Sequence, residues 1–234
     1  VYLKLGDGNK AFSVLKSAID LDSIDGNSYT AETATRANEL GLVYQSLGGY
    51  AKAENLLAKA AQARMQILGD EHPDVAMSLN NLGCLCIAME KYDDAESLLR
   101  SAIAIHDEIP EESQLVREKV AYRANLAGLY SRARRFADAD ILYKQCLENA
   151  SGPYSQNDYE YAALLYKLSC HASDSQNAAD AIHYAIESLS RTRRSIESAS
   201  IILSERQQLE MNQMLRCRLD HYLDCCLNTE IRSD

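Results

Sequence analysis

Apolar residues recur at every third or fourth position in paired stretches of the chain, and short polar breaks separate the stretches. One such pair lies within residues 76–86 and 92–105, and the break between the two falls at Glu90 and Lys91. This spacing places the apolar side chains on one face of an amphipathic α-helix. Two helices joined by so short a turn must lie antiparallel. The pattern therefore predicts an all-α chain of antiparallel helix hairpins.

The hairpin pattern repeats at a nearly constant interval. A leucine in each first helix is followed, 13 residues later, by an alanine in the second helix. The leucines are Leu40, Leu82, Leu126 and Leu168, and the alanines are Ala53, Ala95, Ala139 and Ala181. Both series advance by 42, 44 and 42 residues. One step back from Ala53 gives Ala11, which indicates a truncated copy before the first full one.

This period divides the chain into an array of hairpins and a tail. We expect the array at residues 1–195 and a C-terminal capping or linker helix at 196–234. The expected copies are a truncated repeat at 1–20 and full repeats at about 31–68, 73–108, 112–150 and 157–194. A single hairpin cannot bury its apolar face alone, so neighbouring units must stack.

A small residue follows each of the four leucines, at the place where the two helices of a hairpin are expected to cross. These residues are Gly41, Gly83, Ala127 and Ser169. Larger side chains at this position would push the helices apart. We expect each small residue to face the alanine of its own second helix.

The motif Leu-Gly-x-x-Tyr at residues 40–44, with the alanine that follows it, resembles the tetratricopeptide repeat. The joint Leu-Gly-Asp-Glu-His-Pro-Asp-Val-Ala at residues 68–76 is similar to the kinesin-light-chain subtype of that repeat. The sequence departs from the motif where Cys86 and Ala172 replace the tyrosine. The resemblance implies a right-handed superhelical solenoid whose first helices line a concave groove.

The joint at residues 68–76 carries its own signals for ending one helix and starting the next. Gly69 is expected to take the left-handed conformation that ends a helix. Asp70 or His72 is expected to cap the following helix. Pro73 suits the first turn of that helix, where a missing N–H costs nothing.

Under this resemblance, polar residues of the first helices face the concave groove. The candidates for peptide binding are Asn38, Glu39, Asn80, Asn81, Asn125, Tyr166 and Lys167. Asparagine is a mediocre helix former, so its recurrence on one face needs a reason. Its amide offers a donor and an acceptor at once, which suits binding to the backbone of a peptide. The alternative is that these side chains are solvated or bond neighbouring helices to each other.

Charge and composition exclude several other partners. The net charge of −10 opposes nucleic-acid binding, which requires clustered Lys and Arg. No run approaches the roughly 20 apolar residues of a membrane helix, so no membrane partner is expected. The seven cysteines form no C-x-x-C pair, which favours buried free thiols and a cytoplasmic location.

The sequence contains no motif for catalysis or for a cofactor. It has no glycine-rich phosphate-binding loop, and its five histidines lack metal-ligand spacing. Cys170 and His171 are adjacent, but neighbouring helical residues point about 100° apart and cannot pair as a catalytic dyad. We therefore expect a protein-interaction chain with no catalytic residues, no metal and no cofactor.

The tail is predicted to form one helix that covers the last hairpin. Ser204 and Gln207 fit a capping box at its start. Its apolar positions, spaced by three or four residues, are Met211, Leu215, Leu219, Tyr222 and Cys226. Such a capping helix is what a solenoid requires at its end.

The tail also resembles the segment that links tetratricopeptide arrays to CHAT domains, which are caspase-like peptidases. Residues 203–209 (Leu-Ser-Glu-Arg-Gln-Gln-Leu) and 215–223 carry this resemblance. It implies that the chain is the sensing arm of a larger bacterial protein whose peptidase domain lies outside these residues. The alternative is a stand-alone adaptor similar to kinesin light chain, which the 42-residue period favours.

Overall fold

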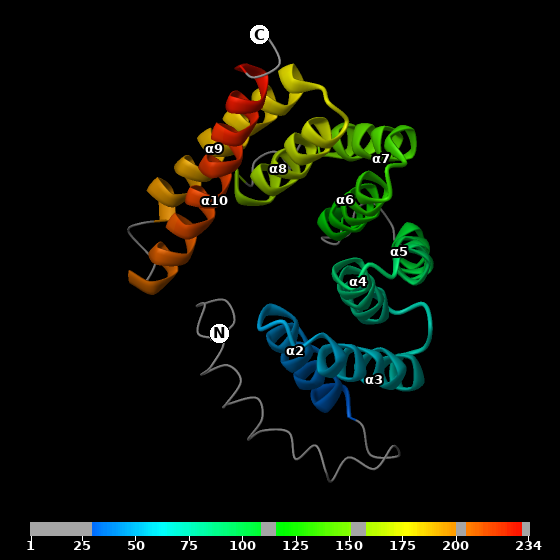
Figure 1. Ribbon diagram of the computed structural model, residues 1–234. Coiled ribbons are helices and arrows are strands. Elements are labelled where there is room, and N and C mark those ends of the chain that lie inside the picture. The colour runs from blue at the N-terminus through cyan, green and yellow to red at the C-terminus, as the bar shows by residue number, and fades with distance from the viewer. Residues whose placement is uncertain (1–29, 109–115, 151–157, 200–204, 231–234) are drawn as a thin grey trace. The chain divides into compact units, whose positions relative to one another are not determined.

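The structure, a computed structural model, describes residues 30–108, 116–150, 158–199 and 205–230 (Figure 1). Within these ranges every element of secondary structure is an α-helix. The helices are α2 (Ala31–Ser46), α3 (Tyr50–Leu68), α4 (Pro73–Ala88), α5 (Tyr92–Asp107), α6 (Val116–Arg132), α7 (Phe136–Asn149), α8 (Asp158–Asp174), α9 (Ala178–Ala199) and α10 (Glu205–Glu230). The truncated copy predicted at 1–20, the cap predicted at Ser204 and the side chains of Gln207 and Met211 lie outside the described residues.

The chain divides into two compact units, residues 1–122 and 123–234, and the boundary falls within α6. In the first unit, the hairpin α2–α3 packs on the hairpin α4–α5 through α3 and α4. In the second unit, α8 and α9 form a hairpin, and α10 lies along α9 (Figure 1). The predicted all-α architecture of helix hairpins is confirmed.

One turn geometry recurs after four of the first helices. The residues with positive φ are Gly48 (76°), Glu90 (60°), Arg134 (61°) and Gln176 (66°). The N–H of the next residue donates to the carbonyl oxygen five residues earlier, and these N···O distances are 2.7–2.9 Å. This bond closes a Schellman motif and satisfies a carbonyl group at the helix end. Three of these turns hold a non-glycine residue in a conformation that costs about 1 kcal/mol.

The predicted small residues lie where the helices of a hairpin cross. A Cβ atom added to Gly41 would lie 2.8 Å from the Leu57 side chain, and one added to Gly83 would lie 2.9 Å from that of Leu99. In α8, Ser169 takes the same position, and its hydroxyl donates a 2.6 Å hydrogen bond to the carbonyl oxygen of Ala181. The predicted close approach of the two helices is therefore confirmed. In unit 1, a leucine side chain of the second helix leaves no room for a larger residue at the glycine.

The joint between α3 and α4 shows which of its predicted signals operate. His72 caps α4, because its Nδ1 accepts a 3.1 Å hydrogen bond from the N–H of Asp74, and Pro73 is the first helical residue. Gly69 has φ 87° and ψ 161°. Gly69 therefore adopts an extended conformation that is essentially restricted to glycine. The prediction of a left-handed helical conformation for this residue was wrong.

Helix α10 packs through a face that only partly matches its apolar spacing, since Leu215, Tyr222 and Cys226 are half-buried. Its buried residues include Arg218 (6% exposed) and Cys225 (4%), whereas Leu219 is 44% exposed. The predicted packed stripe is therefore wrong at Leu219. The Arg218 guanidinium donates a hydrogen bond to Thr192 of α9, and Cys225 packs with Ala181. The surface of the last hairpin thus selects the buried face of α10.

Candidate functional site

In unit 1, a hydrogen bond between two of the predicted groove residues joins neighbouring first helices. Asn81 on α4 donates a 3.1 Å hydrogen bond from Nδ2 to Oδ1 of Asn38 on α2. Asn38 is 5% exposed, and Asn81 is half-buried. This bond uses only part of the donor and acceptor capacity of the two amides. The helix-to-helix bond that the sequence left open as an alternative is therefore present here.

A second pair occurs in unit 2. The Lys167 ammonium on α8 donates a hydrogen bond to Oδ1 of Asn125 on α6. Both side chains are half-buried. A charge-assisted bond of this kind is stronger than one between two neutral groups, so it orients both side chains.

The other candidate residues lie in unlike environments. Asn80 is buried, at 8% exposed, while Glu39 is exposed. Tyr166 is half-buried, and its ring packs edge-on against His221 of α10 at a centroid distance of 5.3 Å. Burial raises the pKa of Tyr166 to about 12. Helix α10 thus contacts Tyr166, one of the residues that the sequence analysis assigned to the peptide-binding groove.

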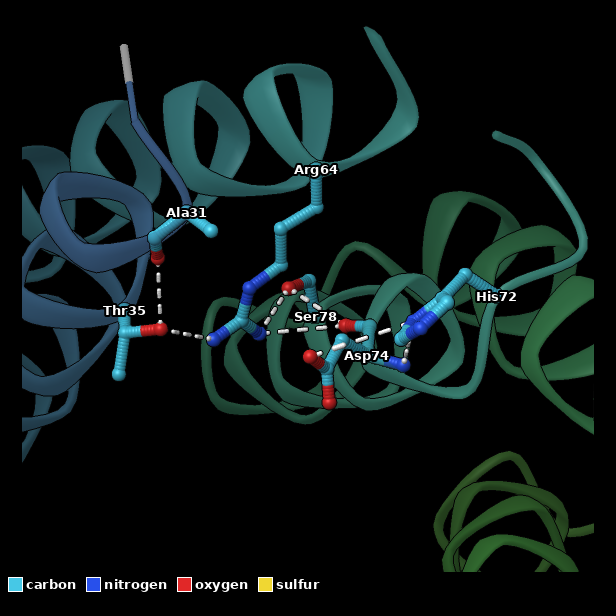
Figure 2. A network of polar contacts seen from close by, with 6 residues as sticks. All are labelled: Ala31, Thr35, Arg64, His72, Asp74 and Ser78. Carbon is cyan, nitrogen blue, oxygen red and sulfur yellow. Dashed lines mark hydrogen bonds and ion pairs between the residues drawn. The ribbon is translucent and has the colours of Figure 1, made fainter. Parts of the chain in front are cut away.

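Sequence reasoning missed a buried cation in unit 1. Arg64 on α3 is 2% exposed, and its guanidinium reaches both neighbouring first helices. It donates hydrogen bonds to the Thr35 hydroxyl (3.0 Å), the Ser78 hydroxyl (2.7 Å) and the Asp74 carbonyl oxygen (3.1 Å), as Figure 2 shows. Burial lowers the pKa of the guanidinium, and the carboxylates of Asp74 and Glu39 oppose this shift.

The signal for this cation was present in the sequence. Arg64 lies 11 residues after Ala53, on the helical face that otherwise carries buried apolar residues of α3. A lone charged residue on such a face indicates a buried polar network. The three acceptors come from three different positions in the chain, so spacing alone could not identify them.

His171 makes a corresponding connection in unit 2. Its Nδ1 lies 2.7 Å from the Ser131 hydroxyl of α6, and its Nε2 lies 2.8 Å from Oδ1 of Asp140 on α7. The Ser131 hydroxyl donates to the Ala127 carbonyl oxygen of its own helix. That bond is 3.0 Å long, and Ser131 is 5% exposed. This buried hydroxyl is inaccessible to a substrate, so the chain of bonds joins helices.

Cys170 contacts Tyr166 of its own helix and His221 of α10. His221 places Nε2 2.9 Å from the Ser169 hydroxyl, 3.8 Å from the Cys170 sulfur and 3.6 Å from the Cys225 sulfur. Burial raises the pKa of the Cys170 thiol to about 11, so it stays protonated at neutral pH. A protonated thiol is a poor nucleophile and a poor metal ligand.

The described residues contain no group of three or more His, Cys, Asp or Glu side chains arranged to hold a metal ion. All seven cysteines lie within the described residues as thiols outside any disulfide, and three of them, Cys86, Cys146 and Cys225, are buried. Cys217 is exposed, so the expectation of a buried thiol was wrong for that residue.

The hairpin geometry and its polar pairs agree with the comparison to known families. Residues 29–108 and residues 121–153 match sequence models of the tetratricopeptide repeat. The similarity to tetratricopeptide repeats thus covers these two segments. A TPR repeat-containing protein of Dictyostelium discoideum is 26% identical over 155 residues. That similarity covers 66% of this chain and 9% of the relative, so the chain spans about a tenth of the relative's length.

Solved structures show the same tetratricopeptide fold. A crystal structure of putative kinesin light chain TPR-like repeats from Podosopora anserina has a TM-score of 0.62 and 19% identity, and covers 81% of this chain and 89% of that one. BtubC (BKLC) from P. vanneervenii has a TM-score of 0.58 and 17% identity, and covers 99% of this chain and 91% of that one. At these identities the likeness establishes the fold alone.

Among the described helices, none is long and apolar enough to cross a membrane.

Proposed function

We propose that this chain binds a peptide, or a segment of another protein, along the polar face of its first helices. Tetratricopeptide repeats are typical protein-interaction scaffolds, and their stacked helices form extended binding surfaces. One observation carries the proposal. Asn81, Asn125 and Lys167 take the same position in three successive repeats, are half-buried, and are held by hydrogen bonds between first helices.

Side chains that are already fixed lose little conformational freedom when a ligand binds. An amide can also donate to and accept from the main chain of a peptide at the same time. These two properties suit recognition of a peptide backbone more than recognition of one particular side chain. The net charge of −10 and the exposed carboxylate of Glu39 favour a basic partner.

The proposal is tested by selecting a peptide ligand for the whole chain from a displayed library and measuring its affinity for two double variants. Asn81→Ala with Asn125→Ala is expected to weaken binding about tenfold or more, because each lost hydrogen bond costs about 0.5–1.5 kcal/mol. The control, Asn55→Ala with Asn149→Ala, removes two exposed asparagines of the second helices. Equal affinities of both double variants, with unchanged helical content, contradict the proposal.

We further propose that binding here is the input to an activity encoded elsewhere in a longer protein, a caspase-like CHAT peptidase. The resemblance of residues 203–209 and 215–223 to a CHAT linker supports this proposal. The contact of α10 with Tyr166 supplies a route from the first helices to that linker. The test is the peptidase activity of the full-length protein with and without the selected peptide, which is expected to change on binding. A parent protein without a peptidase domain contradicts it.

The second candidate is an adaptor that links two other proteins and has no attached enzyme. The likeness to the kinesin light chain repeats of Podosopora anserina favours it. An adaptor requires two ligands that bind at once, so a second partner recovered only together with the first supports this function. Recovery of a single ligand supports the sensing arm instead.

A further inference from the structure

Helix α10 occupies the place of the first helix of a next repeat, and three contacts fix its register. Leu85 of α4 packs in one cluster with Ala53 of the preceding hairpin, and Cys225 of α10 packs in one cluster with Ala181 of its own preceding hairpin. Residue 225 lies 140 positions after residue 85, and Ala181 lies 128 positions after Ala53. This contact aligns each α10 residue with the α4 residue 140 positions before it.

The polar contact at the same joint gives the same register independently. Ser78 of α4 accepts a hydrogen bond from Arg64 of the preceding second helix, and Arg218 of α10 donates one to Thr192 of α9. Residue 218 again lies 140 positions after residue 78, and Thr192 lies 128 positions after Arg64. The cation has moved from the second helix to the first, but the same two positions meet.

The third contact lies on the polar face of the first helices. Asn81 of α4 donates a hydrogen bond to Asn38 of the preceding first helix. In unit 2, the ring of His221 on α10 packs edge-on against Tyr166 of α8 at a centroid distance of 5.3 Å. Residue 221 lies 140 positions after residue 81, and Tyr166 lies 128 positions after Asn38. His221 therefore takes, on α10, the position that Asn81 takes on α4.

The hydrogen bonds of His221 leave one ring nitrogen as an open acceptor. Nε2 lies 2.9 Å from the hydroxyl of Ser169, and this hydroxyl donates its proton to the carbonyl oxygen of Ala181 at 2.6 Å. Nε2 must therefore carry a hydrogen and donate to Ser169, so in the neutral ring Nδ1 is the acceptor. Nδ1 has no hydrogen-bond partner among the described residues and is not a buried atom.

The surroundings of His221 hold its ring in place and leave its side of α10 uncovered. The bond to Ser169 and the contact with Tyr166 fix the ring from α8. Cys217 and Asp224, four residues before His221 and three after it, lie on the same side of α10, and both are exposed. Nδ1 is therefore within reach of a ligand, and a ring that is already fixed loses little conformational freedom when the ligand binds.

We propose that His221 extends the peptide-binding face onto α10 and accepts, at Nδ1, a hydrogen bond from a main-chain N–H of the bound peptide. This inference rests on the proposed function, because it adds a contact to the same face. Within unit 2 that face then includes Asn125 on α6, Lys167 on α8 and His221 on α10. Every residue of a peptide except proline carries a main-chain N–H, so the contact recognises the main chain and not one particular side chain.

Two substitutions of His221 separate binding from folding. His221→Gln keeps an amide nitrogen near the place of Nε2, which donates to Ser169, and leaves no acceptor at the place of Nδ1. It is expected to weaken the binding of a peptide selected from a displayed library about three- to tenfold, with an unchanged melting temperature. His221→Asn keeps an oxygen near the place of Nδ1, as Asn81 does on α4, and loses the bond to Ser169. It is expected to lower the melting temperature and to retain most of the affinity.

The matched control is His183→Gln, at an exposed histidine of α9, which is expected to change neither the affinity nor the melting temperature. Copies of the selected peptide methylated at one main-chain nitrogen at a time identify the N–H that His221 binds. Methylation there is expected to weaken binding to the unaltered chain about as much as His221→Gln does, and to cause no further loss in that variant. Losses that add at every position of the peptide overturn the proposal.

The double variant Asn81→Ala with Asn125→Ala distinguishes the failure of this inference from the failure of the proposed function. An affinity that falls in the double variant but not with His221→Gln overturns this inference alone. An affinity that none of these substitutions changes overturns both. If the affinities of the two His221 variants follow their melting temperatures, the role of His221 is purely structural, and the proposal is overturned.

Discussion

The guanidinium of Arg64 donates a 2.7 Å hydrogen bond to the hydroxyl of Ser78, which ties the second helix of one hairpin to the first helix of the next. Both side chains are buried. Both hydroxyl acceptors of Arg64 also donate to carbonyl oxygens of their own helices, Ser78 to Asp74 and Thr35 to Ala31. Loss of the cation therefore leaves these hydroxyls satisfied, whereas loss of a hydroxyl leaves a buried cation with fewer acceptors.

Ser78→Ala is expected to lower the free energy of unfolding by about 1–3 kcal/mol, because it removes an acceptor from a buried charge. Arg64→Met is expected to cost less than this, since replacement of a buried charge by an apolar side chain of similar length is often nearly neutral. In the Arg64→Met background, Ser78→Ala is expected to cost little. Urea unfolding of the two single variants and the double variant measures the coupling, and additive effects contradict it.

Gly83→Ala is expected to destabilise the chain by about 1–3 kcal/mol, because its new Cβ would lie 2.9 Å from Leu99. Gly128→Ala is the control. A Cβ atom there would find its nearest neighbour, the Tyr143 hydroxyl, at an ordinary 3.7 Å. That variant is expected to gain about 0.5–1 kcal/mol from the higher helix propensity of alanine. Thermal unfolding followed by circular dichroism compares the two, and a shift in the same direction for both contradicts the close-approach account.

Glu90→Gly is expected to stabilise the chain by about 0.5–1 kcal/mol. Glu90 is exposed and has φ 60°, a conformation that glycine adopts without steric cost. Lys59→Gly, at an exposed position inside α3, is expected to destabilise by about 1 kcal/mol, because glycine there only weakens the helix. Opposite shifts in melting temperature are the expected result. A lower melting temperature for Glu90→Gly contradicts the turn geometry.

His106 is expected to make stability fall as the solution is acidified. Its ring is 1% exposed and packs edge-on against Tyr122, and burial lowers the pKa of the imidazole, although Glu118 partly opposes this shift. A histidine whose folded pKa lies below the unfolded value of about 6.5 stabilises the fold above that pH and ceases to do so as pH falls.

The measurement for His106 is the melting temperature between about pH 7.5 and pH 5, the window in which an ordinary histidine gains its proton. The loss of stability over this window is expected to be smaller for His106→Leu than for the unaltered chain. Other titrating groups contribute equally to both proteins. Parallel pH profiles contradict the assignment.

Local signals and the repeat period were sufficient to predict most of the fold. The break at Glu90 and the crossing at Gly83 depend on residues close together in sequence or one repeat apart. The register of α10 could not be predicted in this way, because its distance from α8 does not follow the 42-residue period. Its apolar spacing indicated a packed Leu219, whereas contacts made to Thr192 and Ala181 bury Arg218 and Cys225 instead.

The repeat positions of the candidate site residues could be predicted from the sequence, but their hydrogen-bond partners could not. Asn81 takes the position of Glu39 one repeat earlier, yet it bonds to Asn38, 43 residues before it. The 43-residue separation of this pair differs by one from the 42-residue period. That difference depends on the tilt between neighbouring helices, which cannot be predicted from the sequence. For the same reason, the contact of Tyr166 with His221 could not be anticipated.

The central claim is that a peptide binds along the first helices, and the side-chain amide signals of the asparagines test it most directly. In a ¹⁵N–¹H spectrum of the whole chain titrated with a selected peptide, the amide signals of Asn81 and Asn125 are expected to shift in a saturable way. Those of Asn55 and Asn149, which are exposed on second helices, are expected to stay in place. Saturable shifts at Asn55 and Asn149, with Asn81 and Asn125 unmoved, would contradict the account.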